Sequence, residues 1–482
     1  MINNKPIESF IPLGEPEHGR QWVVGLLLIS SLAQGIALGL AGLLAVRLKI
    51  VDALVPVDAE KSADLLSLED EGFVEVAQGL ALFFSAPIVA LSVDNRSASN
   101  VQLQVISLLA CIVGTLLLPI QHFVEGDDQS DSKHLQHHLL SSLKWMGFVI
   151  VHVGSAAVRP LMAVLVANQV RDGERQGSMI GWNYVSCTFG YCMSVVLFQF
   201  SLKIWVIGIL LLSCLVCSTI IMYTLMANNL LGEYSGPLIP NFWRLSGPHA
   251  GAGTELGEVR SRYDPYLTRI SDYLTSYPSI FSETSSQSRQ NFIKIITLGL
   301  GWRIVSEQKL LWHIQSWSMN DKICIGSSRN STVRSADLTG DDNSDCIEFG
   351  SNVVSFIGSL LGLMLFTCIH SGGIDLKLTV VKERISFGFL LTLFSLLLSI
   401  SIQVFFNLQD VCILWQLPQL LLLNAAEGFI VYSALEYAYM GSQDWPKAGA
   451  AASFFGFQGI GMMAGVGLSL LMRKVPLLSV LL

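Results

Sequence analysis

Two ionisable side chains lie in the middle of long apolar stretches. Arg159 follows Ala-Ala-Val in the first half of the chain, and Glu427 follows Asn-Ala-Ala in the second half. A charge at membrane depth is costly, so it usually faces a cavity, pairs with another charge or lies on a solute or proton path. Opposite charges in opposite halves can hold the two ends of a zwitterion. The sequence therefore predicts Arg159 and Glu427 as substrate-binding residues.

A second group of charges interrupts the apolar run 292–316. Arg303 and Glu307 stand four residues apart, so they can pair on one helix face, and Lys309 follows them. A structural ion pair and a role in proton coupling both fit Arg303 and Glu307. His152, in the same run as Arg159, fits either a proton relay or a hydrogen-bonded core histidine.

The composition predicts that helices in a lipid bilayer position these residues. Of the 482 residues, 51% are hydrophobic and only 14% are charged, whereas soluble domains carry about 25% charged residues. Each crossing needs about 20 apolar residues, and glycines in the first and last runs favour close helix contacts. Eleven spans are predicted, at residues 22–47, 73–93, 101–120, 144–168, 179–200, 204–226, 292–316, 350–370, 385–406, 411–440 and 449–472.

A long polar segment, 231–290, separates six spans from five. The predicted organisation is a cytoplasmic tail at 1–21, a six-helix bundle at 22–226, a cytoplasmic linker at 227–291 and a second helical bundle at 292–482. Two helical bundles with a linker are typical of two-halved transporters, whose substrate site lies at the midplane between the halves. A twelfth helix is expected after Leu482 and is missing.

The basic loops predict an orientation in the membrane. Lysine and arginine are concentrated on cytoplasmic loops, and the loops with Arg96, Arg171 and Lys377 share one side if the N-terminus is cytoplasmic. The more acidic loops that alternate with them then face outward or into an organelle lumen.

One of these acidic loops contains features of an extracytoplasmic segment. It carries the sequon Asn-Ser-Thr at Asn330, together with Cys324 and Cys346. The two cysteines can form a disulfide in an oxidising compartment. The alternatives are an unused sequon and free cysteines.

Several classes of function find no support in the sequence. A net charge of -8 argues against binding of nucleic acid. The chain has no nucleotide-binding glycine-rich loop, no nucleophile elbow and no metalloprotease helix. Cys214 and Cys217 form a CxxC in an apolar run, without a second pair or histidines to complete a metal site. We therefore expect no enzyme, no cofactor and no metal.

The strongest motif lies in the tenth predicted span. The sequence LWQLPQ at 414–419 is followed by Glu427, by LEYAY at 435–439 and by PK at 446–447. This order and spacing resemble the proton-coupled oligopeptide transporters, whose tenth span carries W-Q-x-P-Q, a buried glutamate and L-E-F-A-Y, followed by P-K.

A second region resembles the fourth and fifth spans of the same family. VR at 158–159, ANQVRD at 167–172 and WNY at 182–184 stand where the family carries V-K, A-D-Q and N-W-F-Y. The matching parts are closest to the animal peptide/histidine branch, and weaker similarity extends over nearly the whole chain.

The resemblance implies the major facilitator fold, proton-driven uptake of di- and tripeptides or histidine, and alternating access. Glu427 corresponds to the family's buried glutamate, which engages the peptide amino end or a salt bridge. Arg159 stands where a lysine assists proton coupling, and Trp182 and Tyr184 match aromatic residues on the cavity side.

The departures from the family pattern concern proton coupling. The family's E-x-x-E-R in span one aligns with Ser30, Ala33 and Gln34, so all three charges are lost. A guanidinium at Arg159 stays charged where a lysine could release its proton. In span seven, charges replace the expected aromatic and apolar wall.

Two functions of different classes follow. The first is a divergent symporter for small peptides, histidine or related zwitterions, with facilitated diffusion without protons as a sub-case. The second is a transport-incompetent relative that recruits protein partners as a membrane adaptor or scaffold. We expect either in the plasma membrane or in an endosomal or lysosomal membrane, and the costly charges at Arg159 and Glu427 favour transport.

Overall fold

Long apolar helices make up most of the described chain in this computed structural model. Apolar residues in runs of about 20 favour helices in a membrane because a helix satisfies its own backbone groups. The structure describes residues 17–47, 75–85, 89, 100–118, 133–170, 173–199, 204–228, 230–231, 286–307, 309, 312, 315–316, 319, 322–324, 346–348, 351–372, 380–406, 411–441 and 447–474.

The first half forms the N-terminal bundle. It consists of the helical segment 75–85 and five labelled helices: α1 (Glu17–Arg47), α3 (Asn100–Leu117), α5 (Lys133–Asn168), α6 (Gly173–Gln199) and α7 (Ile204–Ala227). α1 lies centrally, because it contacts α5, α6 and α7.

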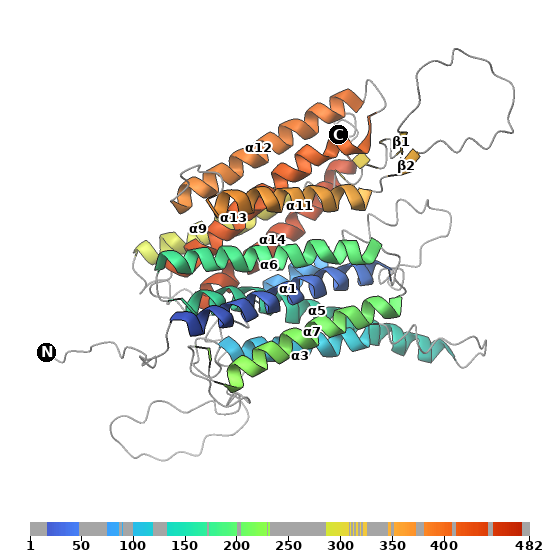
Figure 1. The fold of residues 1–482 in the computed structure, drawn as a ribbon. Helices are drawn as coiled ribbons and strands as arrows, with labels where there is room; N and C mark the ends of the chain where they lie inside the picture. Colours follow the sequence, from blue (N-terminus) through green and yellow to red (C-terminus); the bar gives the residue numbers. More distant parts are fainter. Residues whose placement is uncertain are drawn as a thin grey trace, which may run out of the picture.

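The second half forms the C-terminal bundle. Its helices are α9 (Ser286–Ser306), α11 (Ser351–His370), α12 (Val381–Phe406), the short η2 (Ile413–Gln416), α13 (Leu417–Gly441) and α14 (Lys447–Lys474). Between α9 and α11, β1 (Lys322–Cys324) and β2 (Cys346–Glu348) form a two-stranded antiparallel sheet, which the all-helical expectation does not contain. Figure 1 shows α12 at one edge of the molecule and α3 and α7 at the opposite edge.

Eight helices of the described chain are long and apolar enough to cross a membrane. They are α1, α3, α5, α7, α11, α12, α13 with η2, and α14. α6 and α9 carry more polar residues than these eight, and both contact helices on several sides. Large apolar side chains such as Phe394 and Leu397 are exposed on α12, which suits contact with lipid.

Helix ends differ from the predicted spans in two places. α5 begins at Lys133 rather than near residue 144, because a helix can continue beyond the apolar part of its sequence. α9 ends at Ser306 rather than near residue 316, although residues 309, 312, 315 and 316 are helical. Most of the predicted tail and linker lies outside the described residues, and so does Asn330.

Two buried clusters hold the helices together. One lies inside the N-terminal bundle and includes Leu40, Leu108 and Leu211. The other joins the C-terminal bundle to the N-terminal one, because it includes Phe429 of α13 and Leu161 of α5. The two bundles therefore share a continuous apolar contact.

α1 and α6 approach at the level of their backbones. A Cβ added at Gly35 would collide with the carbonyl oxygen of Cys187, and one added at Gly190 would collide with that of Leu32. Small residues permit such close helix contacts in membranes. This contact fixes α6 against the N-terminal bundle and leaves its other side to face the C-terminal bundle.

Candidate functional site

The two bundles meet along a few helices from each side. α6 contacts α11 and α13, and α5 contacts α14. We call the end of the bundles that carries Arg175, Lys382 and Arg384 the basic end, and the opposite end, where β1 and β2 lie, the hairpin end. The predicted substrate-binding residues Arg159, Trp182, Tyr184 and Glu427 lie on these contact helices.

Arg159 and Glu427 lie on opposite bundles and are both partly exposed. Arg159, on α5, is within electrostatic range of Cys187 and Tyr191 on α6. Glu427, on α13, is within range of Tyr184 on α6. Among the described residues the two charges do not form a direct ion pair. Glu427 is also within electrostatic range of Arg303 on α9 and of Lys309.

Trp182 and Tyr184 extend from α6 to aromatic residues of the other bundle. The ring of Tyr184 stands edge-to-face with Phe366 of α11, with 5.7 Å between centroids, and that of Trp182 with His370, at 6.1 Å. Both aromatic residues therefore lie at the contact between the bundles.

Four charges gather near the hairpin end. Arg303 Nε lies 2.7 Å from Glu307 Oε1, and Lys309 Nζ lies 3.9 Å from Glu75 Oε1. Because Glu75 belongs to the N-terminal bundle, the second pair joins the two bundles. Tyr191 of α6 is within electrostatic range of Arg303, Lys309 and Glu75. The local pair follows from the sequence spacing, whereas the pair between bundles does not.

The basic end carries a second set of polar contacts between the bundles. The Tyr439 hydroxyl of α13 donates to Asn168 Oδ1 of α5 at 2.7 Å, and Lys447 Nζ lies 4.1 Å from the centre of the Tyr439 ring. Gly177 of α6 faces the carboxylate of Glu436, which a Cβ at this position would approach to 2.6 Å. Sequence reasoning did not single out these contacts as a site.

Glu436 is held in place within the C-terminal bundle. Arg384 Nη2 of α12 donates to Glu436 Oε2 at 2.5 Å, and Arg384 Nη1 donates to the Tyr432 hydroxyl at 3.0 Å. The His370 ring stands edge-to-face with Tyr432 at 4.9 Å. Glu436 belongs to the LEYAY motif, which is the one sequence signal that points to this cluster.

His152 lies in the interior of the N-terminal bundle. It is 5% exposed, and its ring stands edge-to-face with Phe148 at 4.3 Å. The charged group within its electrostatic range is Arg159. His152 is therefore buried beside an aromatic ring, and its part in a proton relay stays a prediction.

The span-one positions that replace the family's charges are closed off from the bundle contact. Ser30 Oγ lies 2.7 Å from Ser218 Oγ of α7, and Gln34 Nε2 donates to the same Ser218 Oγ at 2.9 Å. Ser30 and Ser218 are 0% exposed and Ala33 is 8% exposed. These residues form a neutral polar network between α1 and α7, so they can stabilise the bundle but cannot carry a proton as carboxylates do.

We expect that restoring an acid in this network will damage the fold. In a Ser30→Glu variant the carboxylate would be buried against Ser218 without a cation, at a cost of several kcal/mol. The melting temperature in detergent should fall much further than for Ser30→Ala, which loses a hydrogen bond worth about 1 kcal/mol. A stable Ser30→Glu protein with new proton-driven uptake would show instead that Ser30 faces the transport path.

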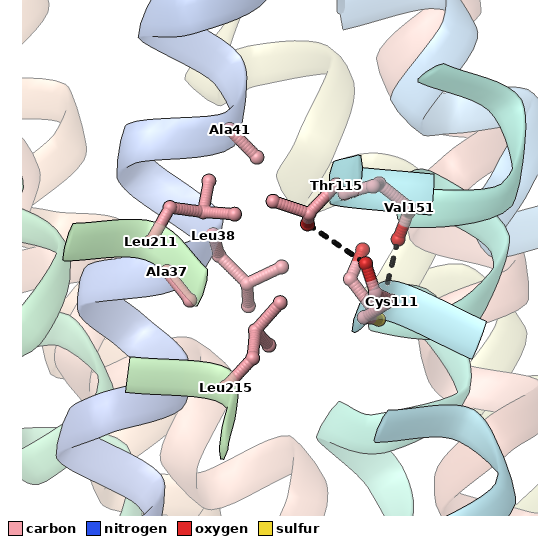
Figure 2. Close-up of a pocket in the computed structure, with 9 residues that line it drawn as sticks. Ala37, Leu38, Ala41, Cys111, Thr115, Val151, Leu211 and Leu215 are labelled. Atoms are coloured by element: carbon pink, nitrogen blue, oxygen red, sulfur yellow. Dashed lines mark hydrogen bonds between the residues drawn. The ribbon is translucent and has the colours of Figure 1, made fainter. Parts of the chain in front are cut away.

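A small cavity among the described residues lies away from the charged residues named above. It measures about 10 Å³ and lies inside the N-terminal bundle, between α1, α3, α5 and α7 (Figure 2). Its walls include Ala37 and Leu215, and the Thr115 hydroxyl beside it donates to the carbonyl of Cys111 at 2.7 Å. A space of this size holds at most about one water molecule, so it is not a site for a peptide or an amino acid.

The sequence alone has no recognisable relatives in two comparisons. No family model matches it, and no curated protein matches it either. Comparison with solved structures, in contrast, finds proteins of similar fold.

The fold is similar to that of several transporters. An auto-inhibited POT family peptide transporter is 14% identical, with 95% of this chain and 90% of that chain covered and a TM-score of 0.59. A POT family transporter in complex with 5-aminolevulinic acid is 11% identical, with 98% and 94% covered and a TM-score of 0.60. The human organic anion transporter MFSD10 is 12% identical, with 97% and 96% covered and a TM-score of 0.57.

These similarities confirm the predicted fold class. The chain is a polytopic helical membrane protein with the fold of the proton-dependent oligopeptide (POT) family transporters. The resemblance inferred from the motifs of the fourth, fifth and tenth spans thus agrees with the fold.

Proposed function

We propose that this chain moves small peptides, histidine or related zwitterions across a membrane by alternating access. The observation that carries the proposal is the placement of Arg159 and Glu427 on opposite bundles of a transporter fold, without a direct ion pair between them among the described residues. A substrate with a carboxylate and an ammonium group satisfies both charges at once. α6 supplies Tyr184 beside Glu427 and contacts both bundles.

The polar contacts at the two ends support alternating access. Tyr439 with Asn168 joins the bundles at the basic end, and Glu75 with Lys309 joins them at the hairpin end. Hydrogen bonds and ion pairs of this kind can separate and reform, whereas interdigitated apolar contacts hold one arrangement. Opening of one end while the other stays closed would expose the substrate to one side of the membrane at a time.

We place proton coupling, where it occurs, at the four charges near the hairpin end. Ser30 and Gln34 carry no group that titrates near neutral pH, and the guanidinium of Arg159 stays charged. A proton bound by Glu75 would weaken its pair with Lys309 and loosen the contact between the bundles, whereas a proton bound by Glu307 would weaken the local pair with Arg303. The proposal includes a cytoplasmic N-terminus and a plasma, endosomal or lysosomal membrane.

Replacement of Glu427 by glutamine tests the substrate site. Loss of a hydrogen bond to a charged group costs about 1.5–3 kcal/mol, so the apparent affinity for labelled histidine or a labelled dipeptide should fall roughly 10- to 100-fold. Uptake into vesicles is measured with an inward proton gradient and without one. Stimulation by the gradient indicates symport, and equal uptake in both conditions indicates facilitated diffusion.

A neighbouring residue of the same helix provides the control. The side chain of Asn424 donates to the carbonyl of Leu420 in its own helix at 2.7 Å, so Asn424→Ala should leave uptake close to that of the wild type. If the protein is verified in the membrane but takes up neither substrate in any condition, the transport proposal is contradicted. The adaptor hypothesis would then be the better explanation. Equal affinity in wild type and Glu427→Gln would contradict the proposed site.

A further inference from the structure

The two-stranded sheet brings two distant cysteines opposite each other. β1 and β2 pair antiparallel with Lys322 opposite Glu348, Ile323 opposite Ile347 and Cys324 opposite Cys346. Cys324 ends β1 and Cys346 begins β2, so the pair lies at the end of the ladder that leads into residues 325–345. The observed register places the two cysteines directly opposite each other. A register shifted by one residue would not.

This backbone arrangement has the spacing that a disulfide needs. Directly opposed residues in antiparallel strands have Cα atoms about 4.5–5.5 Å apart, and disulfides join Cα atoms about 4.4–6.8 Å apart. A bond between Cys324 and Cys346 therefore requires no rearrangement of the strands. It would covalently join the two strands that lie between α9 and α11.

The chain segments just before β1 and just after β2 form side-chain hydrogen bonds that connect them to each other and to α12. Ser316 Oγ lies 2.9 Å from Ser351 Oγ at the start of α11. Gln315 Nε2 donates to Gln403 Oε1 of α12 at 2.9 Å. The chain thus leaves and re-enters the bundle at one place, which keeps the two strands aligned.

The location of the sheet favours an oxidising compartment. α11 has 20 residues, about 30 Å of helix, and runs from the hairpin end to the basic end. Lys382 and Arg384 begin the next helix at that basic end. Because basic residues are concentrated on the cytoplasmic side, the sheet lies on the opposite side, where disulfides persist.

We propose that Cys324 and Cys346 form a disulfide on the extracytoplasmic side of the membrane. The oxidant is the disulfide of a lumenal thiol–disulfide oxidoreductase. One cysteine thiolate attacks that disulfide and forms a mixed disulfide, and the second cysteine thiolate displaces the enzyme's sulfur. The two cysteines lose two protons and two electrons, and the oxidoreductase disulfide becomes a dithiol.

Differential thiol labelling of the full-length protein tests the bond. Free thiols are blocked with maleimide in denaturant, the protein is reduced, and newly exposed thiols react with a polyethylene-glycol maleimide. The wild type should gain two labels only after reduction, and Cys324→Ser and Cys346→Ser should each gain none. A non-reducing digest should contain the two peptides joined, lighter than their sum by two hydrogen atoms.

An exposed cysteine of the helical region serves as the matched control. Cys217 is a free thiol on α7, so Cys217→Ser should keep both reduction-dependent labels. Blocking of Cys324 and Cys346 before reduction would overturn the proposal, and so would a linkage of either one to a different cysteine. Because the readout is covalent, neither result depends on whether the protein transports a substrate.

Discussion

Replacing Glu307 with leucine is expected to destabilise the protein strongly. The Glu307 side chain is 0% exposed, and its Oε1 forms an ion pair with Arg303 Nε at 2.7 Å; the Arg303 side chain is 16% exposed. Removal of one partner of a buried ion pair leaves an uncompensated charge and typically costs about 3–5 kcal/mol. Thermal unfolding in detergent, followed by size-exclusion chromatography, should show a melting temperature far below that of the wild type.

The double variant Arg303→Met with Glu307→Leu separates this effect from simple loss of packing. Buried ion pairs replaced as a whole by apolar residues are often close to neutral in stability. We therefore expect the double variant to recover most of the melting temperature that the single variant loses. A double variant as unstable as Glu307→Leu would mean that Glu307 stabilises the fold through contacts other than Arg303.

Features that depend on neighbouring residues could be predicted from the sequence. Apolar runs predicted the helices, because a helix that crosses the bilayer needs about 20 consecutive apolar residues. The pairing of Arg303 with Glu307 also follows from local spacing on one helix. The start of α5 at Lys133 was missed because apolarity marks the part in lipid and not the helix end.

Contacts between distant residues could not be predicted in this way. Arg384 and Glu436 are 52 residues apart, and Tyr439 and Asn168 are 271 apart. Nothing in a single sequence selects such partners, because many polar residues compete for each one. The placement of Arg159 and Glu427 near different residues of α6 belongs to the same class, and their role in substrate binding stays a prediction.

The family comparison illustrates a related limit. The charges lost at Ser30 and Gln34 suggested weakened coupling, but only the structure shows what replaced them. The side chains of Ser30 and Gln34 form hydrogen bonds with Ser218 of α7, and no sequence pattern indicates these contacts. A polar residue in an apolar run can serve a helix contact as well as a transport path.

Close backbone contact between the bundles leads to the last prediction. A Cβ added at Gly459 of α14 would collide with the carbonyl oxygen of Gly79 and lie 3.0 Å from Leu82 Cβ. A Gly459→Val variant should therefore hold segment 75–85 away from α14 and prevent closure near the Glu75–Lys309 pair. Because the helix contacts within each bundle, such as α1 with α6 and α12 with α13, are not touched by the substitution, we expect folded protein with uptake reduced at least tenfold.

Cross-linking tells this steric effect from a loss of folding. Cysteines introduced as Glu75→Cys and Lys309→Cys replace side chains whose charged atoms lie 3.9 Å apart, so a short cross-linker should join them. The yield should fall when Gly459→Val is added and stay unchanged with Gly467→Val, because a Cβ at Gly467 meets nothing within 4 Å. Unchanged cross-linking and uptake in Gly459→Val would mean that the added side chain is accommodated without opening this contact, and the contact would then be packing rather than part of a gate.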